Sequence, residues 1–100
     1  MERITEDHLT SMFLAGDNLC GINLRGSDLR GIDLSSGTER VAARLSCANL
    51  TRSDLRGSRL RGVELVSADL RLANLEDSNL FGAKLSQADL SEANLRGCNL

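Results

Sequence analysis

The sequence predicts an all-β solenoid, in which a square coil winds about four times and a short helix covers its first turn. Leucine recurs every fifth residue from Leu19 to Leu34 and from Leu45 to Leu100, sixteen times in all. A small residue stands two positions before the leucine in twelve of these pentads, and Asp or Asn stands one position before it in twelve. In a short extended segment, the leucine and the small residue point to the same side, so both face inward.

The pentad period predicts a corner between successive sides. A repeat of five fits neither a helix nor a straight strand, so two residues after each leucine must turn the chain. Counting Leu14 as a centre, eight of the nine glycines occupy the second of these positions, where many tight turns need a positive φ. They are Gly16, Gly21, Gly26, Gly31, Gly57, Gly62, Gly82 and Gly97.

The charges indicate how many sides make one coil. With four pentads per coil, residues twenty apart stack, and the charges alternate in sign down two columns: Arg44, Glu64 and Lys84, and Arg56, Glu76 and Arg96. With three pentads per coil, Arg44 would lie over Arg59, and directly opposed like charges are unfavourable. We therefore expect a square coil.

These pentads resemble those of the pentapeptide-repeat family, whose pattern is Ala, Asp or Asn, Leu or Phe, and two variable residues. The segments 48–52 (ANLTR), 68–72 (ADLRL) and 88–92 (ADLSE) match it closely. The resemblance covers about four fifths of the chain and implies a right-handed quadrilateral β-helix. It implies little about function, because most members of the family have none assigned.

Residues 1–16 are expected to form an N-terminal helical cap. Thr5 is placed to cap a helix, Ile4 and Leu9 are placed as a hydrophobic staple, and Gly16 can terminate it. The competing interpretation continues the five-residue frame back through Leu14, Leu9 and Ile4. We prefer the cap, because a solenoid end that is left uncovered exposes core and strand edges.

Residues 17–100 are expected to form the β-helix, with an excursion loop at 35–42 in place of one corner. Leu34 and Leu45 are eleven residues apart, which leaves room for this loop. A tolerated surface insertion is the simpler interpretation, and a recognition loop on a rigid scaffold is the functional one. The candidate partner loop comprises Ser36, Gly37, Thr38, Glu39 and Arg40.

The last coil is the second candidate surface. The sequence stops on Leu100, a core position, with no capping helix or polar tail after it. We expect either a homodimer through this C-terminal coil or a next coil in a longer protein. The family resemblance adds that members often dimerise there. The candidate assembly surface is Leu85, Leu90, Leu95 and Leu100.

Charge and composition argue against nucleic acid as a partner. The net charge is −2, but the segment 35–62 holds six basic and two acidic residues. This basic belt is Arg40, Arg44, Arg52, Arg56, Arg59 and Arg61. Arginines around a square coil face different directions, and Phe81 is the only aromatic in the repeats, so a solvated structural surface is the preferred interpretation.

Catalysis, cofactors and a membrane span are not expected. The single histidine, His8, lies in the proposed cap without a cysteine nucleophile nearby, and no phosphate-binding loop is present. Cys20, Cys47 and Cys98 lack the spacing of a disulfide framework or zinc site, and Cys98 fits a core position. No apolar run is long enough to span a membrane and no signal peptide precedes the cap, so we expect a cytoplasmic protein.

Two non-catalytic functions are therefore compatible with the sequence. The first is an interaction or scaffold module that binds a protein through a flat side, the loop or the free end. The second comes from the resemblance, because certain family members protect DNA gyrase from quinolones as acidic rods that mimic DNA. This chain differs from them in its near-neutral charge and basic belt, so the first function is preferred.

Overall fold

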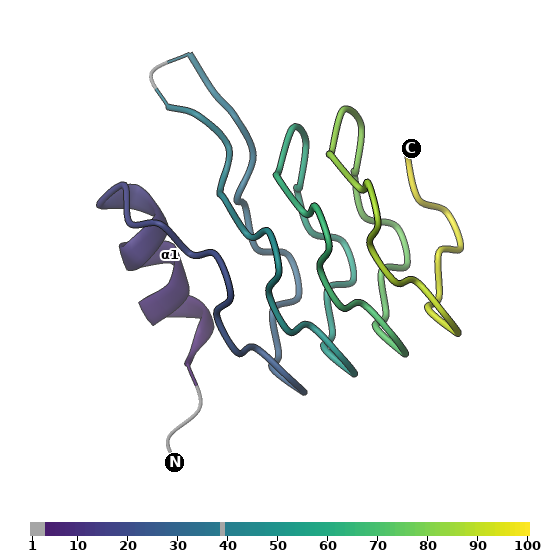
Figure 1. Ribbon diagram of the computed structural model, residues 1–100. Coiled ribbons are helices and arrows are strands. Elements are labelled where there is room, and N and C mark those ends of the chain that lie inside the picture. Colours follow the sequence, from purple (N-terminus) through teal and green to yellow (C-terminus); the bar gives the residue numbers. More distant parts are fainter. Residues whose placement is uncertain (1–3, 39) are drawn as a thin grey trace.

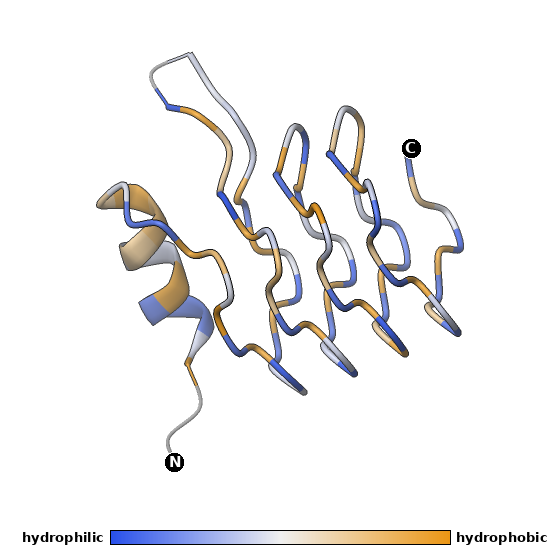
Figure 2. Cartoon of the chain, viewed as in Figure 1, coloured by the Kyte–Doolittle hydropathy of each residue, from blue (hydrophilic) through white to orange (hydrophobic). Residues whose placement is uncertain are grey.

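The computed structural model describes residues 4–38 and 40–100, which form helix α1 (Glu6–Leu14) followed by coils that stack side by side (Figure 1). Hydrophobic and hydrophilic residues alternate along each coil (Figure 2). None of the described helices is long and apolar enough to cross a membrane.

Successive coils are joined by parallel bridges between single residues. Arg44 pairs with Glu64, and Glu64 pairs with Lys84, so paired residues are twenty apart as the charge columns predict. Pairs that involve the first coil are twenty-six apart, as in Asn23 with Asn49, because the loop inserts six residues between them. Each side of a coil contributes a single bridge to the ladder, which is why no longer strand forms. The expected register is confirmed.

The corners adopt the predicted backbone conformation. The Ala48 N–H donates to the Leu45 carbonyl at 3.0 Å, which closes a four-residue turn. Cys47, the third residue of this turn, has φ 62°. The eight predicted glycines share this positive φ, and so do seven other residues at the same pentad position: Cys47, Arg52, Ser67, Leu72, Asp77, Gln87 and Glu92. The corner therefore imposes a left-handed conformation even where the sequence lacks glycine.

The interior is filled by the leucines and small residues that the pattern placed inward. Leu50 is 2% exposed and Ala48 is fully buried, and the other leucine centres from Leu19 to Leu80 are buried as well. The Asp and Asn residues that precede a leucine, from Asn18 to Asn94, each accept a hydrogen bond from the backbone N–H two residues later, as Asn49 does from Thr51 at 3.1 Å. These side chains thus secure the corners, as expected for Asx turns.

Helix α1 covers the first coil, as the sequence predicts. The Thr5 side chain accepts a hydrogen bond from the His8 N–H at 3.2 Å at the N-terminus. At the other end Gly16 has φ 81°, and the Asp17 N–H donates to the Met12 carbonyl at 3.0 Å, which together form a Schellman C-cap. Leu9 is fully buried in the shared core, so the helix is packed on the leucines of the coil.

Candidate functional site

The excursion loop is an enlarged corner. The Ala43 N–H donates to the Leu34 carbonyl at 3.0 Å, which is the same closing bond that joins the third residue after a leucine to that leucine in ordinary corners. At the tip, the Gly37 N–H donates to the Arg40 carbonyl at 3.0 Å. The Ser36 N–H donates to the Arg61 carbonyl of the next coil at 3.2 Å, so the base of the loop is fixed to the solenoid.

Arg40 connects the loop to the first coil and to α1. Its Nε donates to the Ser35 carbonyl at 3.0 Å, and its Nη2 lies 3.2 Å from Asp33 Oδ2. The guanidinium carbon is 5.3 Å from the centre of the Phe13 ring, within cation–π range. Partial burial alone would raise the pKa of Asp33, but the Ser35 hydrogen bonds and Arg40 outweigh it and hold that pKa below its ordinary value. Asp33 therefore stays ionised and anchors the loop near neutral pH.

A groove runs between the end of α1 and the loop. Its largest part is a cavity of about 330 Å³ lined by residues 13–16, Arg40 and Val41. The side chains of Leu14 and Val41 beside it are 63% and 71% exposed, although both are apolar. Two separate cavities of about 110 and 270 Å³ also border Val41, Ala42 and Arg44; the larger one lies toward Glu64 and Lys84 of later coils. We call this surface the loop face, and its residues are Phe13, Leu14, Arg40, Val41, Ala42 and Arg44.

The loop face also contains a gap in the backbone ladder. In the adjacent position, the Leu24 N–H donates to the Asn49 carbonyl at 2.7 Å, and the Asn49 N–H donates to the Ile22 carbonyl at 2.9 Å. Among residues 4–38 and 40–100, no backbone hydrogen bond joins Arg44 to the first coil in this way. The 110 Å³ cavity lies here, between Asp17 and Arg44. The departing loop and the turn after α1 therefore leave one pairing position empty.

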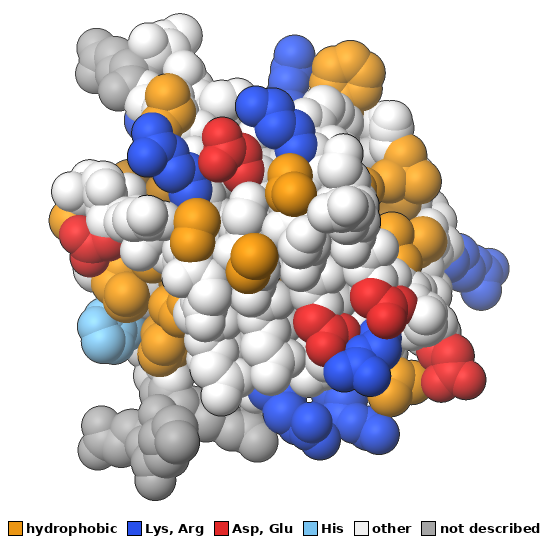
Figure 3. All heavy atoms as spheres, viewed as in Figure 1, with side chains coloured by type: hydrophobic (Ala, Val, Ile, Leu, Met, Phe, Trp, Pro, Cys, Tyr) orange, Lys and Arg blue, Asp and Glu red, His pale blue; other side chains and the backbone are white. Residues whose placement is uncertain are grey.

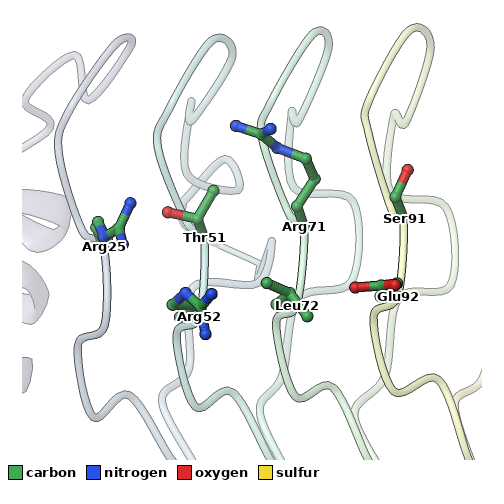
Figure 4. Close-up of a pocket in the computed structure, with 7 residues that line it drawn as sticks. All are labelled: Arg25, Thr51, Arg52, Arg71, Leu72, Ser91 and Glu92. Carbon is green, nitrogen blue, oxygen red and sulfur yellow. The ribbon is translucent and has the colours of Figure 1, made fainter.

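A second groove, the arginine corner, lies on another edge of the solenoid. Its cavity of about 290 Å³ is lined by Arg25, Thr51, Arg52, Arg71, Leu72, Ser91 and Glu92, which come from equivalent corners of successive coils (Figure 4). Arg71 pairs with Asp69 at 2.6 Å and lies 4.0 Å from Asp89. Because these carboxylates and Glu92 lie beside the arginines, the corner has no strong excess of positive charge.

Arginines of the basic belt likewise lie beside acidic or aromatic partners. Arg56 Nη2 lies 2.7 Å from Asp54 Oδ2, and the guanidinium of Arg61 lies 5.2 Å from the Phe81 ring centre. Hydrogen bonds from Arg56 hold the pKa of Asp54 below its ordinary value. On the viewed face, acidic and basic side chains lie next to one another (Figure 3). A row of basic side chains lies along the lower edge of that face, and acidic side chains adjoin it (Figure 3).

The last coil has a different character from the three before it. Leu85, Leu90 and Leu95 are partly exposed, and Leu100 is 64% exposed. The Leu65 N–H donates to the Lys84 carbonyl at 2.8 Å, whereas within the described part of the chain the N–H groups of these last leucines donate no backbone hydrogen bond. Within residues 4–38 and 40–100 no further coil packs on these leucines, and we call the coil that contains Leu85, Leu90, Leu95 and Leu100 the open coil.

Comparison with known proteins identifies the repeat. A model of pentapeptide repeats matches in eight copies over residues 43–80 and 73–100, more than half of the chain. The chain belongs to the pentapeptide-repeat family. No curated protein sequence is similar enough to count as a relative.

Solved pentapeptide-repeat proteins are similar to this family member. One from the cyanobacterium Cyanothece 51142 is 39% identical, with a TM-score of 0.44, over 83% of this chain and 56% of that one. One from Nostoc PCC 7120 is 35% identical, with a TM-score of 0.49, over 88% and 78%. One from the Arabidopsis thaliana thylakoid lumen is 26% identical, with a TM-score of 0.50, over 81% and 63%. The chain thus spans little more than half of the Cyanothece protein.

The described residues of the predicted partner loop differ in their positions and contacts. Ser36 lines the groove beside Arg44, Thr38 is exposed, and Arg40 is the anchor described above. Gly37 forms the tip, and Glu39 lies outside the described residues. Sequence reasoning missed Val41, Leu14 and Phe13. The apolar Val41 in an otherwise polar loop was the available signal.

The residues of possible chemical interest remain dispersed. His8 lies in α1, where its backbone N–H donates to the capping side chain of Thr5. The three cysteines are free, and the Cys98 thiol lies 3.0 Å from the Leu75 carbonyl in a partly buried position. Within residues 4–38 and 40–100, no group of three or more His, Cys, Asp or Glu side chains is arranged to hold a metal ion.

Proposed function

We propose that this pentapeptide-repeat chain is a non-catalytic protein-binding module that contacts its partner through the loop face. The observation that carries the proposal is the exposure of Leu14 and Val41 on either side of one groove. Exposed apolar side chains around a concave surface are typical of protein contacts. The contacts of Arg40 hold the groove in a fixed shape, which reduces the entropy lost on binding.

The test is binding of a purified partner to matched variants. Candidate partners are first captured from source-cell extract and then titrated by calorimetry against the wild-type chain, Val41→Asp and Leu72→Asp. Leu72 is 40% exposed and lies at the arginine corner, so Leu72→Asp controls for a charge added elsewhere. We expect Val41→Asp alone to weaken binding. Equal affinity for all three chains would contradict the use of the loop face.

We also propose that the open coil joins two copies of the chain in a homodimer. Its leucines form an apolar end, and its free N–H groups offer an edge for pairing. A second copy supplies the same apolar surface and the same edge, which suits a two-fold interface. We also propose that the coil winds in a right-handed direction, as the family implies. A cytoplasmic location is proposed as well, and the three free cysteines support it.

We do not propose that the chain mimics DNA toward gyrase. A DNA mimic needs a continuous acidic surface, whereas the paired column Arg44, Glu64 and Lys84 alternates in sign. Several aspartates are also neutralised by arginine, as Asp28 is by Arg30 at 2.8 Å. In supercoiling assays with purified gyrase, we expect neither inhibition nor protection from quinolones. Either effect would restore this alternative.

A further inference from the structure

We propose that the loop face binds a short peptide segment that combines one large apolar side chain with neighbouring carboxylates. This inference rests on the proposed protein-binding function and specifies its partner. Three features of the loop face favour such a segment: an apolar cavity, a nearby unpaired arginine, and the gap in the backbone ladder.

The cavity between α1 and the loop favours an apolar anchor. Five of its six lining residues, residues 13–16 and Val41, present carbon-rich or glycine surface, and Arg40 is the sixth. The volume of about 330 Å³ far exceeds the roughly 10–15 Å³ that is enough, on the same measure, for one water molecule. An inserted aliphatic or aromatic side chain would remove water from both Leu14 and Val41. Such a buried anchor usually dominates the binding energy of a small interface.

One base beside the cavity is available to a carboxylate. The three cavities around residues 40–44 are together lined by Arg40, Arg44 and Lys84 and by Glu64 and Asp17. Two of these bases are already paired, Arg40 with Asp33 at 3.2 Å and Lys84 with Glu64 at 3.8 Å. Within the described residues Arg44 forms no salt bridge, although it lines both smaller cavities. An acidic side chain that follows the anchor along the groove would supply its partner.

The empty ladder position favours an extended peptide. Elsewhere, a backbone like that of Asn49 exchanges hydrogen bonds with the coil before it, but among the described residues the Arg44 N–H and carbonyl make no such bonds. A peptide backbone that enters this end of the groove can bond to these groups. Main-chain bonds of this kind are sequence-independent, so the anchor and the carboxylates would provide the specificity.

A protein segment suits these features better than nucleic acid. Single-stranded nucleic acid is usually bound by several cations together with exposed aromatic platforms. At the loop face, the one aromatic ring, Phe13, is 8% exposed and lies beneath Arg40. Leu14 and Val41 would instead lie against a polar sugar-phosphate backbone, which gains nothing from their burial.

Selection from a random twelve-residue peptide library on the full chain tests this inference. We expect the enriched peptides to contain Asp or Glu near one Leu, Ile, Phe or Trp. In fluorescence anisotropy, Val41→Asp and Arg44→Glu should each weaken their binding by about tenfold. The matched controls Leu72→Asp and Arg52→Glu, at the arginine corner, should leave binding unchanged. Circular dichroism establishes that every variant is folded.

Four results would overturn the inference: no enriched peptide, peptides without carboxylates, equal losses in the controls, or displacement of the peptides by a 20-nucleotide single-stranded DNA. The last would indicate a nucleic-acid site instead. A failure of this peptide inference can be distinguished from a failure of the proposed protein-binding function. If the purified partner still depends on Val41 but not on Arg44, only the peptide chemistry is wrong. If it depends on neither, the loop face itself is wrong.

Discussion

The two ends of the solenoid are built from the same pentads but differ in how their leucines are covered. In the first coil, Leu24 and Leu29 are fully buried beneath α1. In the last coil, Leu95 is partly exposed and Leu100 is 64% exposed. The pentad therefore determines which way a leucine points, while the next layer determines whether that leucine leaves water.

The ends also differ in their corners. The first coil uses Gly21, Gly26 and Gly31 at the left-handed position, whereas the last uses Gln87 and Glu92 before Gly97. All of them have positive φ, but only glycine adopts it without steric cost. The first coil, which also carries the large excursion, is thus built with the less strained corners.

The largest expected effect tests the coverage of the leucines. Leu9→Ala should lower the free energy of unfolding by about 3 kcal/mol, because it leaves a cavity between α1 and the first coil. Leu90→Ala in the open coil should cost about 1.5 kcal/mol, because less of that side chain is removed from water. Urea titrations at concentrations where the chain is monomeric measure both. Equal losses would contradict the difference between the ends.

A pair of glycine substitutions tests how firmly the loop is packed on the solenoid. Gly57→Ala meets nothing within 4 Å but has to adopt φ 67°, which should cost about 1 kcal/mol. Gly62→Ala has a similar φ and would also place its Cβ 3.2 Å from Ser36 Oγ at the base of the loop. It should cost about 2 kcal/mol in thermal unfolding. If the two losses are the same, Ser36 yields freely and the loop is less constrained than described.

A glycine introduced into the open coil should stabilise the folded chain. Glu92 has φ 58°, so Glu92→Gly removes a steric penalty and should raise the free energy of unfolding by about 0.5 kcal/mol after the entropy of glycine is subtracted. Ser86→Gly is the control, because Ser86 is not among the residues with positive φ and gains no such relief. Stabilisation by both, or by neither, would show that the corner strain is not the cause.

The smallest expected effect is on acid stability. The Arg30 hydrogen bond lowers the pKa of Asp28 from its ordinary 3.8 to about 2, so the ionised carboxylate favours the folded chain. This contribution is present above pH 4 and is lost as the pH falls toward 2. Asp28→Asn should therefore flatten the decline of the urea midpoint between these values.

Asp89→Asn in the open coil is the matched control for this measurement. Hydrogen bonds from Ser91 are the main cause that lowers the pKa of Asp89, and Arg71, 4.0 Å away, contributes less. Its acid dependence should then resist added salt, whereas that of Asp28 should weaken with salt. An unchanged acid dependence in Asp28→Asn would assign the acid sensitivity to other carboxylates.

The register was predictable from the repeat, because the alternating charges of Arg44, Glu64 and Lys84 indicate that stacked residues are twenty apart. Helix α1 was predictable because Thr5 and Gly16 mark its ends. The left-handed corners at residues such as Leu72 were not, because the coil imposes a conformation that leucine by itself avoids.

The candidate site was less predictable than the fold. The loop at 35–42 was expected from the eleven-residue spacing, but its groove depends on where Arg40 and α1 meet across the first coil. Local sequence does not report such a contact. The missing pairing at Arg44 arises in the same way, since it depends on how two distant segments diverge.

Solution mass by light scattering across a dilution series tests most directly whether the two ends act differently. The chains compared are the wild type, Leu95→Glu and Leu100→Glu in the open coil, and Leu14→Glu at the covered end, each with its fold checked by circular dichroism. We predict a dimer for the wild type and Leu14→Glu, and a monomer for both open-coil variants. A monomeric wild type, or a dimer that survives both open-coil substitutions, would contradict the proposed assembly.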